Sequence, residues 1–173
     1  MTVITIGPGA ILGGSGATTG FTYTDSTGPA SGTGNLNAVE LWYRTAGGGV
    51  KVGCFSGNYW AMTGRTPATI GVVTSGSKQT FTGLSFPVVT GDWLGSYSAS
   101  GTPEKTGGPH GYYVSGDKTG GAASFSDGGA GTGYSFYAYS VEGGAGVRNK
   151  QISIGDRRSK RHRSFFRRNL KLK

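Results

Sequence analysis

From Val39 to Phe55 the chain reads VELWYRTAGGGVKVGCF. Residues 39–44 and 50–55 alternate between apolar and polar side chains, and a period of two is typical of β-strands. The five residues between these runs include three glycines, which suit a tight loop. We therefore predict a β-hairpin here and expect the fold to be built from antiparallel strands.

Short runs of the same kind recur along the chain. We expect further strands at residues 58–62, 69–73, 78–81, 92–97, 111–114 and 134–141, with weaker signals at 3–6 and 21–23. No segment of the first 147 residues carries the apolar stripe of an amphipathic helix, and parallel sheets need crossover helices. The predicted fold is all-β: an antiparallel β-sandwich, jelly-roll-like, with a basic C-terminal tail.

Glycine is the unusual feature of the composition. It accounts for 35 of the 173 residues, whereas average proteins contain about 7%. There is no Gly-X-Y period, which excludes collagen. Aromatic residues make up 12% of the chain, and disordered chains are poor in aromatics. The combination favours many short strands joined by tight turns.

Charge divides the chain into two expected parts. Residues 1–147 contain six Lys or Arg and seven Asp or Glu, a net of −1, whereas residues 148–173 contain eleven basic residues against Asp156, a net of +10. The sum is the chain's +9. We therefore predict a glycine-rich β-sandwich domain over 1–147 and a basic tail over 148–173.

The residues that usually carry chemistry are few. The single cysteine, Cys54, allows no internal disulfide and is expected to be a small buried hydrophobe. His110 sits between Pro109 and Gly111, as expected of a turn residue. No phosphate-binding loop, nucleophile elbow, metal-ligand spacing or locally marked carboxylate pair is present. We expect no enzymatic activity, no metal and no cofactor.

Aromatic side chains are the candidate binding residues of the body. Adjacent aromatics such as Tyr112 and Tyr113 must point to opposite faces of a strand, so one of each pair faces away from its own core. Exposed Trp and Tyr rings can stack on sugar rings or form a subunit interface. The candidate ligand-facing aromatics are Trp60, Trp93 and Tyr112.

Three stretches resemble β-sandwich modules of phage and virus-derived structural proteins. They are TIGVVTSGSKQTFTGL at 69–84, VTGDWLG at 89–95 and GYYVSGD at 111–117, and the resemblance spans roughly residues 36–141. It implies a lectin-like or jelly-roll sandwich used on a virion as a capsid, decoration, fibre or tail component. It implies no catalytic residues, and the basic tail lies outside it.

The tail is expected to bind an acidic partner. A like-charged segment repels itself, and hydrophobic anchors within it favour folding on a partner. The partner would be nucleic acid or an acidic neighbouring protein, with an anionic lipid surface as a third option. The expected binding residues are Arg157, Arg158, Lys160, Arg161, Arg163, Arg167, Arg168, Lys171 and Lys173, and the expected anchors are Phe165, Phe166 and Leu170.

These observations together predict a virion structural protein that forms a homo-oligomer with other capsid subunits and is made in the host cytoplasm. The first alternative is a carbohydrate-binding or receptor-binding module. A nucleic-acid-binding protein, with the body as a scaffold, is the second alternative. The sequence begins with no signal-peptide pattern and contains no run long enough for a transmembrane segment.

Overall fold

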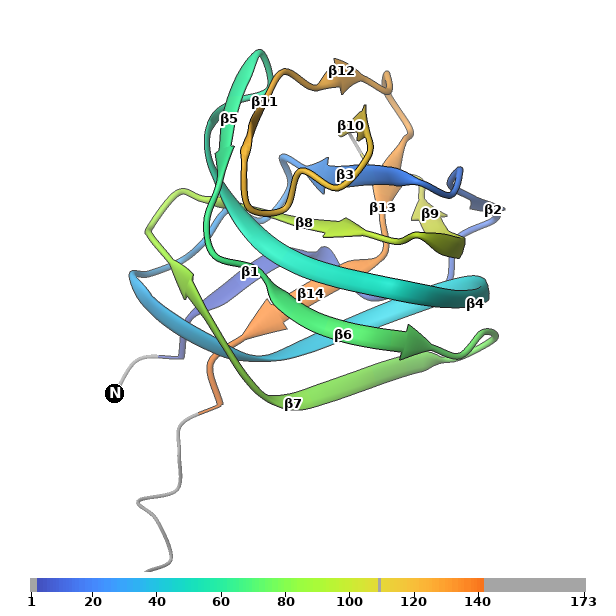
Figure 1. Ribbon diagram of the computed structural model, residues 1–173, viewed down its shortest axis with the longest axis horizontal. Coiled ribbons are helices and arrows are strands. Elements are labelled where there is room, and N and C mark those ends of the chain that lie inside the picture. The colour runs from blue at the N-terminus through green and yellow to red at the C-terminus, as the bar shows by residue number, and fades with distance from the viewer. Residues whose placement is uncertain (1–2, 109, 142–173) are drawn as a thin grey trace, which may run out of the picture. The chain divides into compact units, whose positions relative to one another are not determined.

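A computed structural model describes residues 3–108 and 110–141, and within them it contains only strands, turns and loops (Figure 1). Every strand pairing is antiparallel, which confirms the predicted all-β class. The strands are β1 (Thr5–Gly9), β2 (Ser15–Gly16), β3 (Phe21–Asp25), β4 (Gly34–Asn58), β5 (Ala61–Gly64), β6 (Ala68–Val73), β7 (Lys78–Val88), β8 (Trp93–Tyr97), β9 (Ser100–Thr106), β10 (Gly111–Ser115), β11 (Ala122–Ala123), β12 (Ser126–Asp127), β13 (Gly133–Tyr134) and β14 (Phe136–Tyr139).

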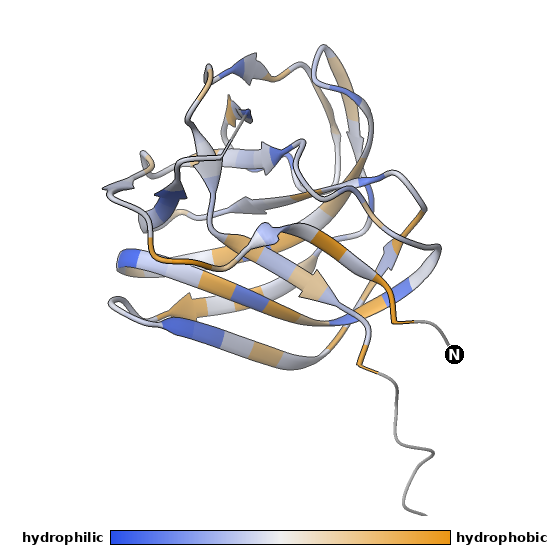
Figure 2. Cartoon of the chain, turned by 180° about the vertical axis from the view of Figure 1, so that it is seen from behind, coloured by the Kyte–Doolittle hydropathy of each residue, from blue (hydrophilic) through white to orange (hydrophobic). Residues whose placement is uncertain are grey.

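The strands form one antiparallel sheet that curls like half of a barrel (Figure 1). Its main path runs in the order β1-β14-β4-β8-β3-β10-β12, and β5, β6, β7 and β9 also pair with β4. Figure 2 shows hydrophobic and hydrophilic residues alternating along the long strands, as a sheet with one buried face requires. The arrangement as a two-layer jelly roll stays a prediction.

The predicted hairpin at 39–55 is wrong, because both runs belong to the single long strand β4. Leu41 pairs with Gln79 of β7 and Val52 pairs with Ala68 of β6. The first half of β4 is therefore paired with β7 and the second half with β6. The ladder shifts register around Gly47. A Cβ on Gly47 would lie 2.5 Å from the Tyr43 ring, so this glycine lets the strand bend tightly instead of closing a loop.

Because β4 bends, side chains from its two halves pack into the same hydrophobic core. Val39 and Tyr43 from the first half and Val52 and Cys54 from the second are at most 1% exposed and belong to one hydrophobic cluster. The prediction that Cys54 is a buried small hydrophobe is confirmed. Burial raises the pKa of its thiol well above the ordinary value.

A second, smaller cluster lies at the end of β4. Its buried members are Phe55, Met62, Tyr112 and Phe125. Residues 58–62, predicted as one strand, are divided by a two-residue turn at Tyr59-Trp60, with Asn58 and Ala61 as the closing pair. This turn places aromatic side chains at one end of the sheet.

The chain divides into a first unit, Met1–Glu142, and a second unit, Gly143–Lys173. The predicted basic tail at 148–173, with all its proposed contact residues, lies outside the described residues. The described part contains no helix that could cross a bilayer.

Candidate functional site

Four aromatic rings lie in a continuous row at the β4–β5 turn. The Trp60 ring centroid lies 4.6 Å from that of Tyr59, with the two rings tilted by 39°. Tyr59 stacks nearly parallel on Tyr112 at 4.8 Å and 12°, and Tyr112 stacks on Trp93 at 5.5 Å and 19°. We call Trp60, Tyr59, Tyr112 and Trp93 the aromatic stack. It begins at the surface, where Trp60 is 67% exposed.

The backbone around Trp60 is firmly held. The Asn58 side-chain oxygen accepts the Trp60 N–H at 3.2 Å, and the Ser124 hydroxyl donates to the Trp60 carbonyl at 2.6 Å. The Phe125 N–H donates to the Tyr59 carbonyl at 2.8 Å. The exposed indole is therefore presented by a turn that is fixed on both sides.

The structure brings together the three aromatics predicted from the sequence, but they do not share one role. Trp60 is exposed and Trp93 is half-buried. Tyr112 is only 7% exposed and stacks on both Tyr59 and Trp93, so it packs inside the aromatic stack, and its contact with a ligand stays a prediction. The sequence did not indicate Tyr59, because neighbouring rings in the strand predicted at 58–62 would point to opposite faces.

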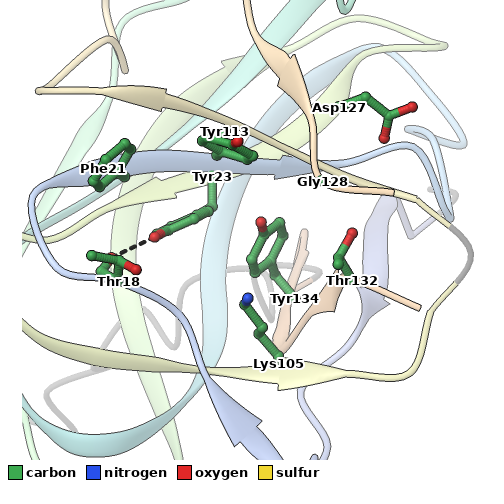
Figure 3. Close-up of a pocket in the computed structure, with 9 residues that line it drawn as sticks. All are labelled: Thr18, Phe21, Tyr23, Lys105, Tyr113, Asp127, Gly128, Thr132 and Tyr134. Atoms are coloured by element: carbon green, nitrogen blue, oxygen red, sulfur yellow. Dashed lines mark hydrogen bonds between the residues drawn. The ribbon is translucent and has the colours of Figure 1, made fainter. Parts of the chain in front are cut away.

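A separate pocket of about 350 Å³ lies against β3, β10 and β13 (Figure 3). Tyr113 lines it, and Tyr113 follows Tyr112 on β10, so the pocket lies on the opposite face of this strand from the aromatic stack. We call it the tyrosine pocket. It is lined by Thr18, Phe21, Tyr23, Lys105, Tyr113, Asp127, Gly128, Thr132 and Tyr134.

Two of the tyrosines are deeply packed. Tyr23 and Tyr134 are 4% and 1% exposed, with ring centroids 4.5 Å apart. The Tyr23 hydroxyl donates to the Thr18 carbonyl, and burial raises the pKa of Tyr23 to about 12. Burial, followed by the nearby Tyr23 and Asp25, also raises the pKa of Tyr134. Both phenols are thus neutral hydrogen-bonding groups at ordinary pH.

A buried carboxylate positions Tyr134. Asp25 is 1% exposed, and its two oxygens accept the backbone N–H groups of Thr27 at 2.7 Å and Tyr134 at 3.0 Å. Burial raises the pKa of Asp25, although these hydrogen bonds and His110 act in the other direction. Asp25 therefore ties β13 to β3 and supports the pocket wall.

The pocket carries one cation and one anion. Lys105 comes from β9, and its Cα pairs with that of Tyr134. Asp127, which is 47% exposed, accepts the Gly129 N–H at 2.7 Å and lies 3.8 Å from the His110 ring. No ion pair joins Lys105 to another residue of the described part. In the view of Figure 3, Lys105 and Asp127 lie on different sides of the Tyr134 ring.

The carboxylate of Asp92, which precedes β8, is buried in an ion pair with Arg65. Asp92 is 3% exposed, and Arg65 donates to both of its oxygens. Asp92 also accepts the Val89 N–H at 2.8 Å. Arg65 borders a second hollow of about 560 Å³ that also includes Pro67 and Pro87. The bidentate pair joins the β5–β6 connection to the β7–β8 turn.

Among residues 3–108 and 110–141, no three His, Cys, Asp or Glu side chains gather closely enough to hold a metal ion. Comparison with known proteins finds no match: no family model fits the chain, and no curated protein or solved structure is significantly similar to it. The aromatic stack and the tyrosine pocket are therefore interpreted from their own geometry.

Proposed function

We propose that the β domain is a non-enzymatic carbohydrate-binding module that uses Trp60 as its stacking platform. The observation that carries the proposal is that Trp60 is 67% exposed although its turn is fixed and its ring rests on Tyr59. Exposed tryptophan and tyrosine rings with an apolar face and a polar tip are favoured contact residues of binding surfaces. A ring that is held in place loses little conformational entropy when it binds.

A sugar ring suits this surface. One face of a pyranose presents C–H groups that pack against an indole, while its hydroxyls stay in water. Tyr59 packs against the indole and Tyr112 packs behind Tyr59, so the Trp60 ring is supported from inside the domain. An enzyme would need groups that touch the reacting atoms, whereas Trp60 offers a stacking face without an acid–base pair beside it in the described part.

The test is a glycan array probed with the full chain, followed by titration of any positive glycan. Trp60→Ala should weaken binding roughly tenfold or more, and Trp60→Phe should recover part of it. Val72→Ala is the matched control, because Val72 is 69% exposed on β6 and lies outside the aromatic stack. A blank array, or equal affinity for the Trp60→Ala variant, would exclude the platform.

We also propose that the domain acts as a jelly-roll-like subunit of a virion, as a capsid, decoration or fibre component. Ile11 and Leu12 favour this second role, because two adjacent large apolar side chains are 56% and 66% exposed between β1 and β2. Such a pair suits contact with another subunit. The basic sequence at 148–173 would supply the link to nucleic acid or to an acidic neighbour.

This second proposal is tested by particle assembly. Ile11→Ser with Leu12→Ser should lower incorporation into particles, and deletion of 148–173 should remove a salt-sensitive interaction with nucleic acid or with the neighbour. Incorporation that is unchanged in both variants would contradict a structural role.

A further inference from the structure

We propose that the tyrosine pocket is a second binding site, specific for a single pyranose that carries a carboxylate, such as a uronic acid. The pocket and Trp60 lie on opposite faces of β10, so one small ligand cannot occupy both. The inference therefore goes beyond the proposed platform and does not depend on it. The pocket volume of about 350 Å³ falls within the range of small-ligand sites.

The first argument is an unused hydroxyl in a buried position. Tyr134 is 1% exposed and lines the pocket; its hydroxyl has no hydrogen bond to a described residue, and it is not among the fully enclosed unpartnered atoms, so it keeps contact with the pocket. A buried tyrosine hydroxyl usually has a partner. Tyr23 illustrates the usual case, because its hydroxyl donates to the Thr18 carbonyl. The Tyr134 hydroxyl is instead available to a molecule inside the pocket.

The second argument is charge. Lys105 lines the pocket without an ion-pair partner in the described part, whereas its neighbour Glu104 is directed elsewhere, with Arg44 3.7 Å away. An ammonium beside aromatic walls favours an anion that also accepts hydrogen bonds from phenols. Lys105 and Tyr134 are cross-strand partners on β9 and β13 and both line the pocket, so a carboxylate bound there could contact both side chains. The pKa shift of Tyr134 supports this, since its phenol stays a donor.

The third argument identifies a sugar ring as the carrier of the carboxylate. Four of the nine lining residues are aromatic, and two of these, Phe21 and Tyr113, are only half-buried, which leaves ring surface for the C–H face of a pyranose. Asp127 and Thr132 add oxygens that can accept hydrogen bonds from sugar hydroxyls. A simple inorganic anion would leave both the aromatic walls and Asp127 without a function.

The experiment titrates the full chain with D-glucuronic acid and D-galacturonic acid, and compares D-glucose, D-galactose and acetate, with amide chemical shifts as the readout. At least one uronic acid should bind about tenfold or more tightly than its neutral sugar and than acetate. Lys105→Met should abolish that preference, and Tyr134→Phe should weaken uronic acid binding several-fold. Lys118→Met is the matched control, because Lys118 lies outside the pocket lining and should bind as the unmodified chain does.

The amide shifts of the pocket residues Gly128 and Thr132 report binding in the pocket, which separates this inference from the proposed platform at Trp60. If neither uronic acid binds, or if the neutral sugars bind equally well, the pocket does not select an acidic sugar. Acetate that competes as well as the uronic acids would show that only the anion is recognised, and it would overturn the pyranose assignment. A Lys105→Met variant that keeps the preference would overturn the carboxylate position.

Discussion

Replacing Arg65 with methionine tests whether the buried ion pair holds two connections of the sheet together. Arg65 donates to both oxygens of Asp92, and Asp92 is 3% exposed. Methionine keeps a long unbranched side chain but donates no hydrogen bond. Of the donors named here, the Asp92 carboxylate would then keep only the Val89 N–H. Removing one partner of a buried pair costs about 3–5 kcal/mol.

For Arg65→Met we expect a smaller loss of stability, because the Arg65 side chain is 29% exposed and water can partly replace its hydrogen bonds. We therefore expect a loss of about 2–3 kcal/mol in the free energy of unfolding. At about 4 °C per kcal/mol for a domain of this size, Tm should fall by about 8–12 °C. Thermal unfolding followed by near-ultraviolet circular dichroism, together with urea denaturation, measures both quantities.

Lys51→Met is the control, because Lys51 pairs with Asp117 at 2.6 Å on the exposed surface and its loss should barely change Tm. The double variant Arg65→Met with Asp92→Leu should recover part of the lost stability, since it removes the unpaired carboxylate. If Arg65→Met unfolds at the same temperature as Lys51→Met, the Arg65–Asp92 pair does not stabilise the fold.

Three further predictions concern buried groups. Burial raises the pKa of Tyr23 from 10.0 to about 12; its contribution to stability is therefore present below pH 10 and lost as pH rises through about 12, and Tyr23→Phe should lower by one the number of tyrosines that ionise late in an ultraviolet titration, since Tyr134 also has a raised pKa. Gly95→Ala should destabilise the domain by about 2 kcal/mol, because a Cβ there would lie 2.4 Å from the Phe55 ring; Gly121→Ala, with open space around it, should have little effect on urea denaturation, and similar costs for both would contradict the packing argument. Cys54 is 0% exposed with a raised thiol pKa, so it should react with a thiol reagent only after denaturation, and fast labelling of the native protein would refute its burial.

Local patterns predicted the class of fold and several strands. The runs at 92–97 and 111–114 match β8 and β10 to within one residue at each end. Strand β9 was missed, because Gly101 and Pro103 break the expected pattern; in the structure Pro103 pairs with Tyr43 of β4. Pattern alone also could not distinguish a bent strand from a hairpin at 39–55, since both use glycine between alternating runs.

The sequence predicted part of the aromatic stack but did not predict the tyrosine pocket. Trp60 was identified as one of the Trp and Tyr rings that could be exposed, although the predicted strand at 58–62 did not indicate the turn on which it lies. The tyrosine pocket was not, because its lining comes from segments far apart in the chain, around Tyr23, Lys105, Tyr113 and Tyr134. Nothing in the sequence indicates that β13 pairs with β9, and that pairing places Tyr134 beside Lys105.

The pairing of the first strand, β1, with the last strand, β14, affects how the chain can fold during its synthesis. Thr5 of β1 pairs with Tyr139 of β14, and β14 in turn pairs with β4 through Phe136 and Leu41. On a ribosome the first strand must wait until the last one emerges, and such sequence-distant pairing makes folding slow. Until then one side of β4 lacks its neighbour, so the nascent chain has an open strand edge that a chaperone, or a second nascent copy, could occupy.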